Sequence, residues 1–123
     1  MKIHIYEKTH VLNMSPLKFY KCLADDTRLK SLLLLVSVRE ACVCDLMAAL
    51  ELDQPKISRH LAELRKCGIV MDERRGRWVY YRIHPDMPDW VMQVLWETNQ
   101  ANADYIALSL KRLNASVQSA ACC

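Results

Sequence analysis

Apolar positions recur at helical spacing three times in the first part of the chain. Ser15 and Pro16 suit an N-cap and a first helical position, and an apolar face follows them. The pair Asp25-Asp26 opens a second helix with apolar residues at every third or fourth position. A third, short helix is predicted over roughly residues 42–50. The apolar positions of the first two helices are Leu17, Phe19, Tyr20, Leu23, Leu29, Leu32, Leu33 and Val36.

A fourth helix is predicted between Asp53 and Gly68. Asp53 suits an N-cap, Pro55 lies early in the first turn, and Gly68 stands just past the last turn. The apolar residues between them again fall at helical spacing: Ile57, Leu61 and Leu64.

The hydrophobic period then changes from helical spacing to alternation. Residues 69–74 and 77–83 flank a short turn, and Gly76 supplies the positive φ that the turn requires. This pattern predicts a two-stranded hairpin. Pro85 and Pro88 end the second strand, and a single long helix is predicted over residues 89–113.

Four helices, a hairpin and a final helix follow the order of a winged helix-turn-helix. The predicted fold class is therefore mainly α with a small β-hairpin. We expect one domain over residues 1–123, with its core in residues 15–113 and a flexible tail in residues 114–123. The apolar residues of the last helix exceed what a monomer of this size can cover. We therefore expect a homodimer that pairs through its terminal helices.

The amino-acid composition of the chain excludes several classes of function. The chain has only 2 glycines, so it cannot form a Gly-rich nucleotide-binding fingerprint or a Walker-type loop. No cysteine and histidine signature of a nucleophile with its base is visible, which argues against an enzyme. The N-terminus lacks the apolar run of a signal peptide, and no stretch approaches the roughly 18 apolar residues of a membrane span. We expect a cytoplasmic protein with no membrane partner, in which thiols stay reduced.

Positive charge is concentrated in residues 54–84. This segment holds eight basic and three acidic residues, a net charge of +5, whereas the whole chain carries +3. A solvated helix followed by an ordinary basic hairpin would also give a charge run. The helix-turn-helix order favours double-stranded DNA instead, with phosphates and base edges as the contacts. The predicted DNA-binding residues are Gln54, Lys56, Ser58, Arg59 and His60 on the fourth helix, and Arg74, Arg75 and Arg77 in the hairpin turn.

The six cysteines fall into three groups. Cys22 and Cys67 stand alone, and we interpret them as small buried apolar residues. Cys42 and Cys44 form a C-x-C pair at the start of the third helix. In an ideal helix their side chains point about 200° apart, so both reach one ion only if the helix start unwinds. From the spacing alone, a thiolate site for a soft ion and two buried structural cysteines remain comparable readings.

The segment from Ala41 to Leu46 and the run Gln-Pro-Lys-Ile-Ser-Arg-His-Leu at residues 54–61 resemble the ArsR/SmtB family of metal-responsive repressors. The similarity covers roughly residues 16–96 and is strongest to the arsenic-responsive members. The resemblance implies a homodimeric repressor on an inverted-repeat operator, with no permanent cofactor. It also implies release from DNA when trivalent arsenic or antimony, As(III) or Sb(III), binds Cys42 and Cys44 as thiolate ligands.

One position departs from the arsenic-responsive pattern, because Met47 stands where a third cysteine is common. A thioether cannot replace a thiolate ligand of As(III). Either two thiolates suffice, which favours organoarsenicals such as methylarsenite, or Cys122 or Cys123 supplies the third sulfur. A redox sensor or a repressor responsive to cadmium, lead or zinc are the alternatives. The absence of an N-terminal cysteine argues against the cadmium and lead class. The absence of histidine in residues 89–113 argues against the zinc class.

Overall fold

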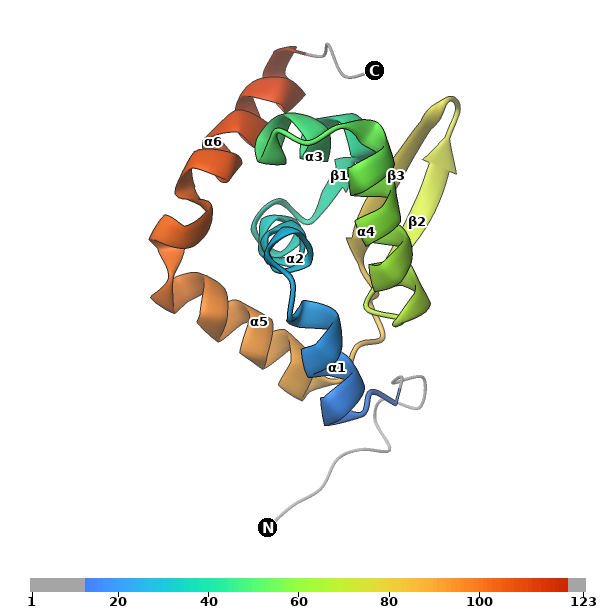
Figure 1. The fold of residues 1–123 in the computed structure, drawn as a ribbon, viewed down its shortest axis with the longest axis vertical. Coiled ribbons are helices and arrows are strands. Elements are labelled where there is room, and N and C mark those ends of the chain that lie inside the picture. The colour runs from blue at the N-terminus through green and yellow to red at the C-terminus, as the bar shows by residue number, and fades with distance from the viewer. Residues whose placement is uncertain (1–12, 120–123) are drawn as a thin grey trace.

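A computed structural model describes residues 13–119 of the chain. Helices α1 (Pro16–Leu23), α2 (Asp26–Val38), α3 (Val43–Leu50), α4 (Gln54–Lys66), α5 (Asp89–Ala101) and α6 (Ala103–Ser119) are joined by three strands. These strands are β1 (Glu40–Cys42), β2 (Val70–Arg75) and β3 (Trp78–Ile83). In Figure 1, α2 is seen end-on at the centre of a ring formed by the other elements. The order and classes of these elements confirm the predicted winged helix-turn-helix.

The central position of α2 follows from its sequence. Leu32, Leu33, Leu34 and Leu35 are all buried, with no more than 1% of any of them exposed. Four consecutive buried residues cover the whole circumference of a helix, so neighbours must pack on every side. Helices α3, α4, α5 and α6 all contact α2.

The ends of the early elements follow the local signals in the sequence. The side chains of Ser15, Asp25 and Asp53 each cap a helix by accepting a hydrogen bond from a backbone N–H three residues later. Gly68 follows α4 with a φ of +86°, and Gly76 turns the hairpin with a φ of +66°. The predicted caps and both predicted glycine roles are confirmed.

The third strand, β1, was not predicted. It pairs antiparallel with β3, so that the sheet order is β1-β3-β2 and Cys42 lies opposite Tyr80. Cys42 is therefore extended, with φ −85° and ψ 166°, and it precedes α3 as the N-cap residue. The predicted helix over roughly residues 42–50 is confirmed to within one residue, and strand pairing holds Cys42 just outside it, so this sulfur does not need the helix to unwind.

The predicted long helix over residues 89–113 is also wrong, because it is interrupted at Asn102. The amide Nδ2 of Asn102 donates a hydrogen bond to the carbonyl oxygen of Thr98 at 2.9 Å. A side chain that bonds nearby backbone competes with helix continuation. The second segment, α6, then extends to Ser119 and includes residues 114–119, which the pattern had assigned to a flexible tail.

Large apolar side chains remain exposed on three of the helices. They lie on α1, α5 and α6, and none lies on α4 or the hairpin among the described residues. None of the helices in residues 13–119 has the length and apolarity that a membrane crossing requires. The exposed side chains are Leu17, Tyr20, Trp96, Tyr105, Leu108 and Val117.

The cap of α4 gives a first test of this fold. We expect Asp53→Ala to lower the free energy of unfolding by about 1 kcal/mol, because the N–H of Lys56 loses its acceptor. Urea denaturation followed by circular dichroism, at one fixed protein concentration, measures the change. Asp53→Ser retains a good cap and should stay close to the parent. Equal losses in both variants would show that the cap does not stabilise α4.

Candidate functional site

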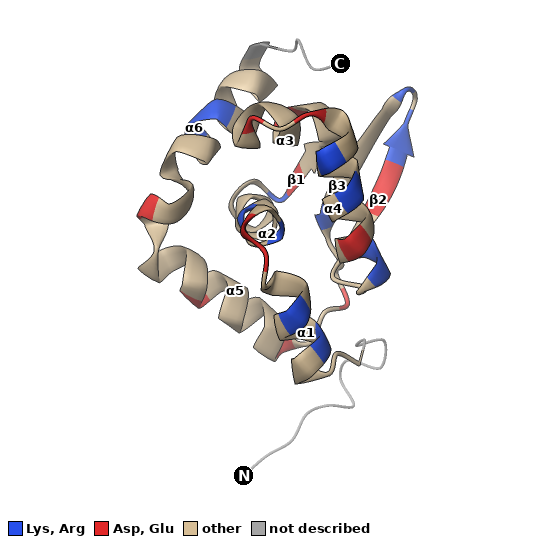
Figure 2. Ribbon diagram, in the orientation of Figure 1, with Lys and Arg blue, Asp and Glu red and all other residues tan. Residues whose placement is uncertain are grey.

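Helix α4 presents a polar face at its N-terminal end. Gln54, Lys56 and Arg59 are exposed and Ser58 is half-buried. The amide Nε2 of Gln54 donates a hydrogen bond to Oγ of Ser58 at 2.7 Å, so these two side chains are ordered together. Figure 2 shows basic residues along α4 and at the tip of the β2–β3 hairpin, on one side of the molecule. The structure thus brings the two parts of the predicted basic segment together.

The hairpin turn carries two arginines that project from the wing. Arg74 and Arg77 are exposed. The guanidinium of Arg74 approaches the carbonyl oxygen of Gly76 at 3.5 Å, and that of Arg77 lies 5.9 Å from the ring centroid of Trp78. Neither arginine forms an ion pair within the described residues, so both charges are free to meet a phosphate.

Arg75 differs from Arg74 and Arg77, because its guanidinium already forms ion pairs with carboxylates of this chain. Its guanidinium donates two hydrogen bonds to Glu40, at 2.8 and 2.7 Å, and one to Glu73 at 3.1 Å. It also lies 4.5 Å from the ring centroid of Tyr80. These hydrogen bonds from Arg75 hold the pKa of Glu40 below its usual value. No local pattern predicts this pairing, since Glu40 lies 35 residues away on the strand that was not predicted.

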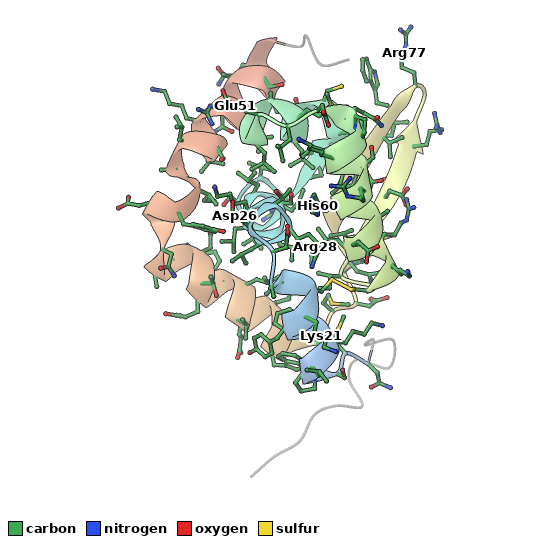
Figure 3. All side chains as sticks on the ribbon, in the orientation of Figure 1. Lys21, Asp26, Arg28, Glu51, His60 and Arg77 are labelled. Carbon is green, nitrogen blue, oxygen red and sulfur yellow. A yellow bond between two sulfur atoms is a disulfide. The ribbon has the colours of Figure 1, made fainter. Side chains whose placement is uncertain are left out.

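His60, which we predicted to contact DNA, turns away from the exposed polar face of α4. Its side chain is only 17% exposed, and Nδ1 lies 3.6 Å from Oδ2 of Asp25 at the start of α2. Figure 3 shows His60 directed from α4 towards α2. The helical spacing explains the difference, because position 60 is three residues after buried Ile57 and four before buried Leu64. That spacing could have placed His60 correctly.

The two cysteines of the C-x-C pair lie at the junction of β1 and α3. Cys42 is 3% exposed and Cys44 is half-buried, and neither is a free thiol. The Sγ of Cys42 lies 3.2 Å from Oδ2 of Asp45. The other oxygen of this buried carboxylate accepts a hydrogen bond from Ser116 of α6 at 2.7 Å. Sequence reasoning missed both Asp45 and Ser116.

A cavity of about 370 Å³ opens beside Cys42. Trp78 and Tyr80 from β3 and Val117 from α6 supply its apolar lining, and Asp45 supplies a carboxylate. The cavity therefore lies between the wing, α3 and α6. A ligand held by the sulfur of Cys42 would contact all three.

The described residues do not supply a third strong ligand at this place. They contain no group of three or more His, Cys, Asp or Glu side chains arranged to hold a metal ion. Met47 is half-buried and packs against the hydrophobic core. Cys122 and Cys123, the other predicted candidates, lie outside the described residues.

The interpretation of Cys22 and Cys67 as separate small apolar residues is wrong. They form a disulfide across 45 residues, between α1 and the C-cap of α4. Cys22 is 4% exposed and belongs to the core, and Cys67 packs against it. No local signal relates two isolated cysteines so far apart in the sequence.

Comparison with known proteins places this arrangement in a family. Residues 25–72 match the family model described as bacterial regulatory protein, arsR family. The chain is 50% identical over 113 residues to the arsenic resistance transcriptional regulator ArsR1 of Pseudomonas putida, covering 89% of this chain and 88% of that protein. It is 44% identical over 111 residues to the arsenical resistance operon repressor of Escherichia coli, covering 88% of this chain and 95% of that protein.

Solved structures agree with the fold. Reduced HlyU from Vibrio cholerae superposes with a TM-score of 0.63 at 28% identity, over 69% of this chain and 85% of that one. The AntR antimony-specific transcriptional repressor superposes with a TM-score of 0.61 at 26% identity, over 85% of this chain and 96% of that one. These relatives are transcriptional regulators and not enzymes. With its helix-turn-helix, its basic wing and this extent of identity, the chain belongs to the arsR family of bacterial regulatory proteins.

Proposed function

We propose that this protein is a transcriptional repressor that leaves its operator when As(III) or Sb(III) binds Cys42 and Cys44. The observation that carries the proposal is the position of the two cysteines at the β1–α3 junction. Strand β1 pairs with the wing, and α3 packs against α4. Relatives named for arsenic resistance and a fold neighbour named as antimony-specific support the class of inducer.

Double-stranded operator DNA is the proposed partner of α4 and the wing. Gln54 and Arg59, at the start of α4, carry the side chains that pair with adenine and guanine edges in the major groove. Lys56, Arg74 and Arg77 supply positive charge for phosphates. Ser58 orders Gln54, and Arg75 adds its charge only when it is released from Glu40.

We propose a homodimer as the binding form. Exposed apolar side chains gather on α1, α5 and α6 and stay away from α4. A second copy that covers them would leave both copies of α4 uncovered. A two-fold dimer then matches an inverted-repeat operator, because half-site spacing mirrors the symmetry of the protein.

Ligand binding is coupled to DNA through the backbone of Cys42. This residue faces Tyr80 across the β1–β3 ladder, and Cys44 lies in the first turn of α3. A ligand bound to both sulfurs would join β1 to α3, and its size would set the position of the wing relative to α4. The ligand and DNA then weaken each other's binding, by a coupling that is typically about 1–3 kcal/mol.

Replacing the C-x-C sulfurs tests the inducer site. We expect the reduced Cys42→Ser/Cys44→Ser variant to bind operator DNA like the parent but to stay bound when arsenite is added. Fluorescence anisotropy of a labelled operator measures release against arsenite, antimonite, methylarsenite, zinc and cadmium in parallel. Cys22→Ser/Cys67→Ser is the matched control and should still release DNA. A double variant that responds normally to arsenite would overturn the assignment.

Substitutions at two residues of α4 distinguish recognition of base edges from binding to phosphates. We expect Arg59→Ala to weaken binding to the operator by about 1–3 kcal/mol while hardly changing binding to unrelated DNA. Lys56→Ala should weaken binding to both DNAs alike and reduce the slope of log K against log salt by about one. The salt titration on both DNAs measures each effect. An equal loss on both DNAs for Arg59→Ala would refute its role in base reading.

The Glu40–Arg75 pair gives a test of the wing. We expect Glu40→Gln to tighten DNA binding at low salt, because Arg75 is released for a phosphate, and we expect the gain to fade at high salt. The same substitution in an Arg75→Ala background should have no effect. A gain that persists without Arg75 would show that the carboxylate acts on DNA directly.

A further inference from the structure

A second pair of sulfurs lies at the other end of α4 from the junction of β1 and α3. Cys22 ends the buried face of α1, and Cys67 follows the last turn of α4. The disulfide shows that these two sulfurs can meet. In Figure 3 the yellow bond lies between the end of α1 and the end of α4, with Lys21 and Arg28 nearby. The site of Cys42 and Cys44 does not include either residue.

Both cysteines line a cavity of about 420 Å³. Three cations line it, Lys18, Lys21 and Arg28, against the single carboxylate of Glu63. Arg28 is fixed in place, because its Nε donates a hydrogen bond to the carbonyl oxygen of Cys22 at 2.7 Å. Positive charge around a thiol favours the thiolate, which is the form that binds soft ligands.

The cavity also has an apolar wall. The side chain of Leu17 is 67% exposed, and it lines the cavity together with Cys22. The methylene stems of Lys18 and Lys21 can add apolar surface while their ammonium groups stay in water. An organic group attached to a sulfur-bound atom would therefore find both room and apolar contact here.

We propose that Cys22 and Cys67, once reduced, form a second dithiol site that binds trivalent organoarsenicals carrying one organic substituent. Such a compound needs two sulfur donors, because its organic group occupies the third position on arsenic. The described residues offer no group of three ligands that would select inorganic As(III) or a metal ion here. The site does not depend on the sensor role of Cys42 and Cys44.

Binding of the organoarsenical to the two thiols is a ligand exchange that needs no oxidant. A compound R–As(OH)₂ exchanges its two hydroxyl groups for the two sulfurs, which gives R–As(SR′)₂ and two molecules of water. Arsenic stays trivalent throughout. Each thiol gives up one proton to a departing hydroxyl group. The only prior step is reduction of the disulfide by an external thiol or phosphine.

Phenylarsine oxide is the probe for the test. The full chain carrying Cys122→Ser and Cys123→Ser is reduced with a phosphine, desalted and incubated with the probe and an excess of a monothiol. Intact-protein mass spectrometry then counts the phenylarsenic groups that survive the competition. Four cysteines remain in this background, so two stable adducts are expected. Adding Cys42→Ser/Cys44→Ser should leave one adduct, and adding Cys22→Ser/Cys67→Ser instead should remove one.

Single variants show whether both sulfurs act on one arsenic atom. Cys22→Ser and Cys67→Ser should each lose the adduct under monothiol competition, because one sulfur cannot chelate. Lys18→Gln/Lys21→Gln should retain the adduct but form it more slowly. The proposal is overturned if the Cys42→Ser/Cys44→Ser protein holds two reactive thiols and yet no adduct. It is also overturned if the parent background, fully reduced, holds one adduct and Cys22→Ser/Cys67→Ser, folded by circular dichroism, keeps that adduct unchanged.

The result is independent of the proposed function. Adduct mass reports binding alone, so loss of arsenite-induced DNA release in another variant does not change it. Conversely, normal release at Cys42 and Cys44 together with no adduct at Cys22 and Cys67 would overturn this inference alone.

Discussion

The pairing of three residues of β1 with β3 is the interaction on which the functional arrangement depends. It holds Cys42 extended opposite Tyr80 and keeps that sulfur outside α3. It also brings Glu40 to the edge of the wing, where its carboxylate meets Arg75. Without this short strand, the cysteine pair and the hairpin would be separate elements. With it, a displacement at Cys42 reaches β3 through backbone hydrogen bonds, which transmit motion better than flexible side chains.

The charge on the proposed DNA face is less uniform than the sequence implies. Among the eight basic residues of residues 54–84, Arg65 is paired with Asp72 and Arg75 is paired with Glu40 and Glu73. Exposed pairs of this kind contribute little to folding. These pairs weaken DNA binding more than they stabilise the fold, because a paired arginine must break its ion pair with the carboxylate before it can bind a phosphate. The other six form no ion pair within the described residues: Lys56, Arg59, Lys66, Arg74, Arg77 and Arg82.

The parts of this fold that the sequence predicts are those set by local chemistry. Asp53 as a cap, Gly68 after α4 and Gly76 in the turn each need only their immediate neighbours in the chain. The failures depend on distant partners: β1 exists because β3 lies beside it, and the disulfide joins residues that are 45 positions apart. Position 60 is the instructive exception. Its inward direction follows from the spacing of buried Ile57 and Leu64, which the charge of the surrounding segment obscures.

The buried carboxylate of Asp45 would extend the effect of the proposed ligand binding beyond the wing. Its two oxygens are shared between the sulfur of Cys42 and the hydroxyl of Ser116 on α6. When Cys42 is a thiol, that carboxylate accepts a hydrogen bond from it. When the sulfur gives up its proton to bind a ligand, Oδ2 loses a donor, and a buried acceptor without a donor is costly. Asp45 must then shift, and Ser116 must follow or lose its own acceptor. Since α6 also carries exposed Leu108 and Val117, such a shift would reach the surface that we propose for the second copy as well as the wing.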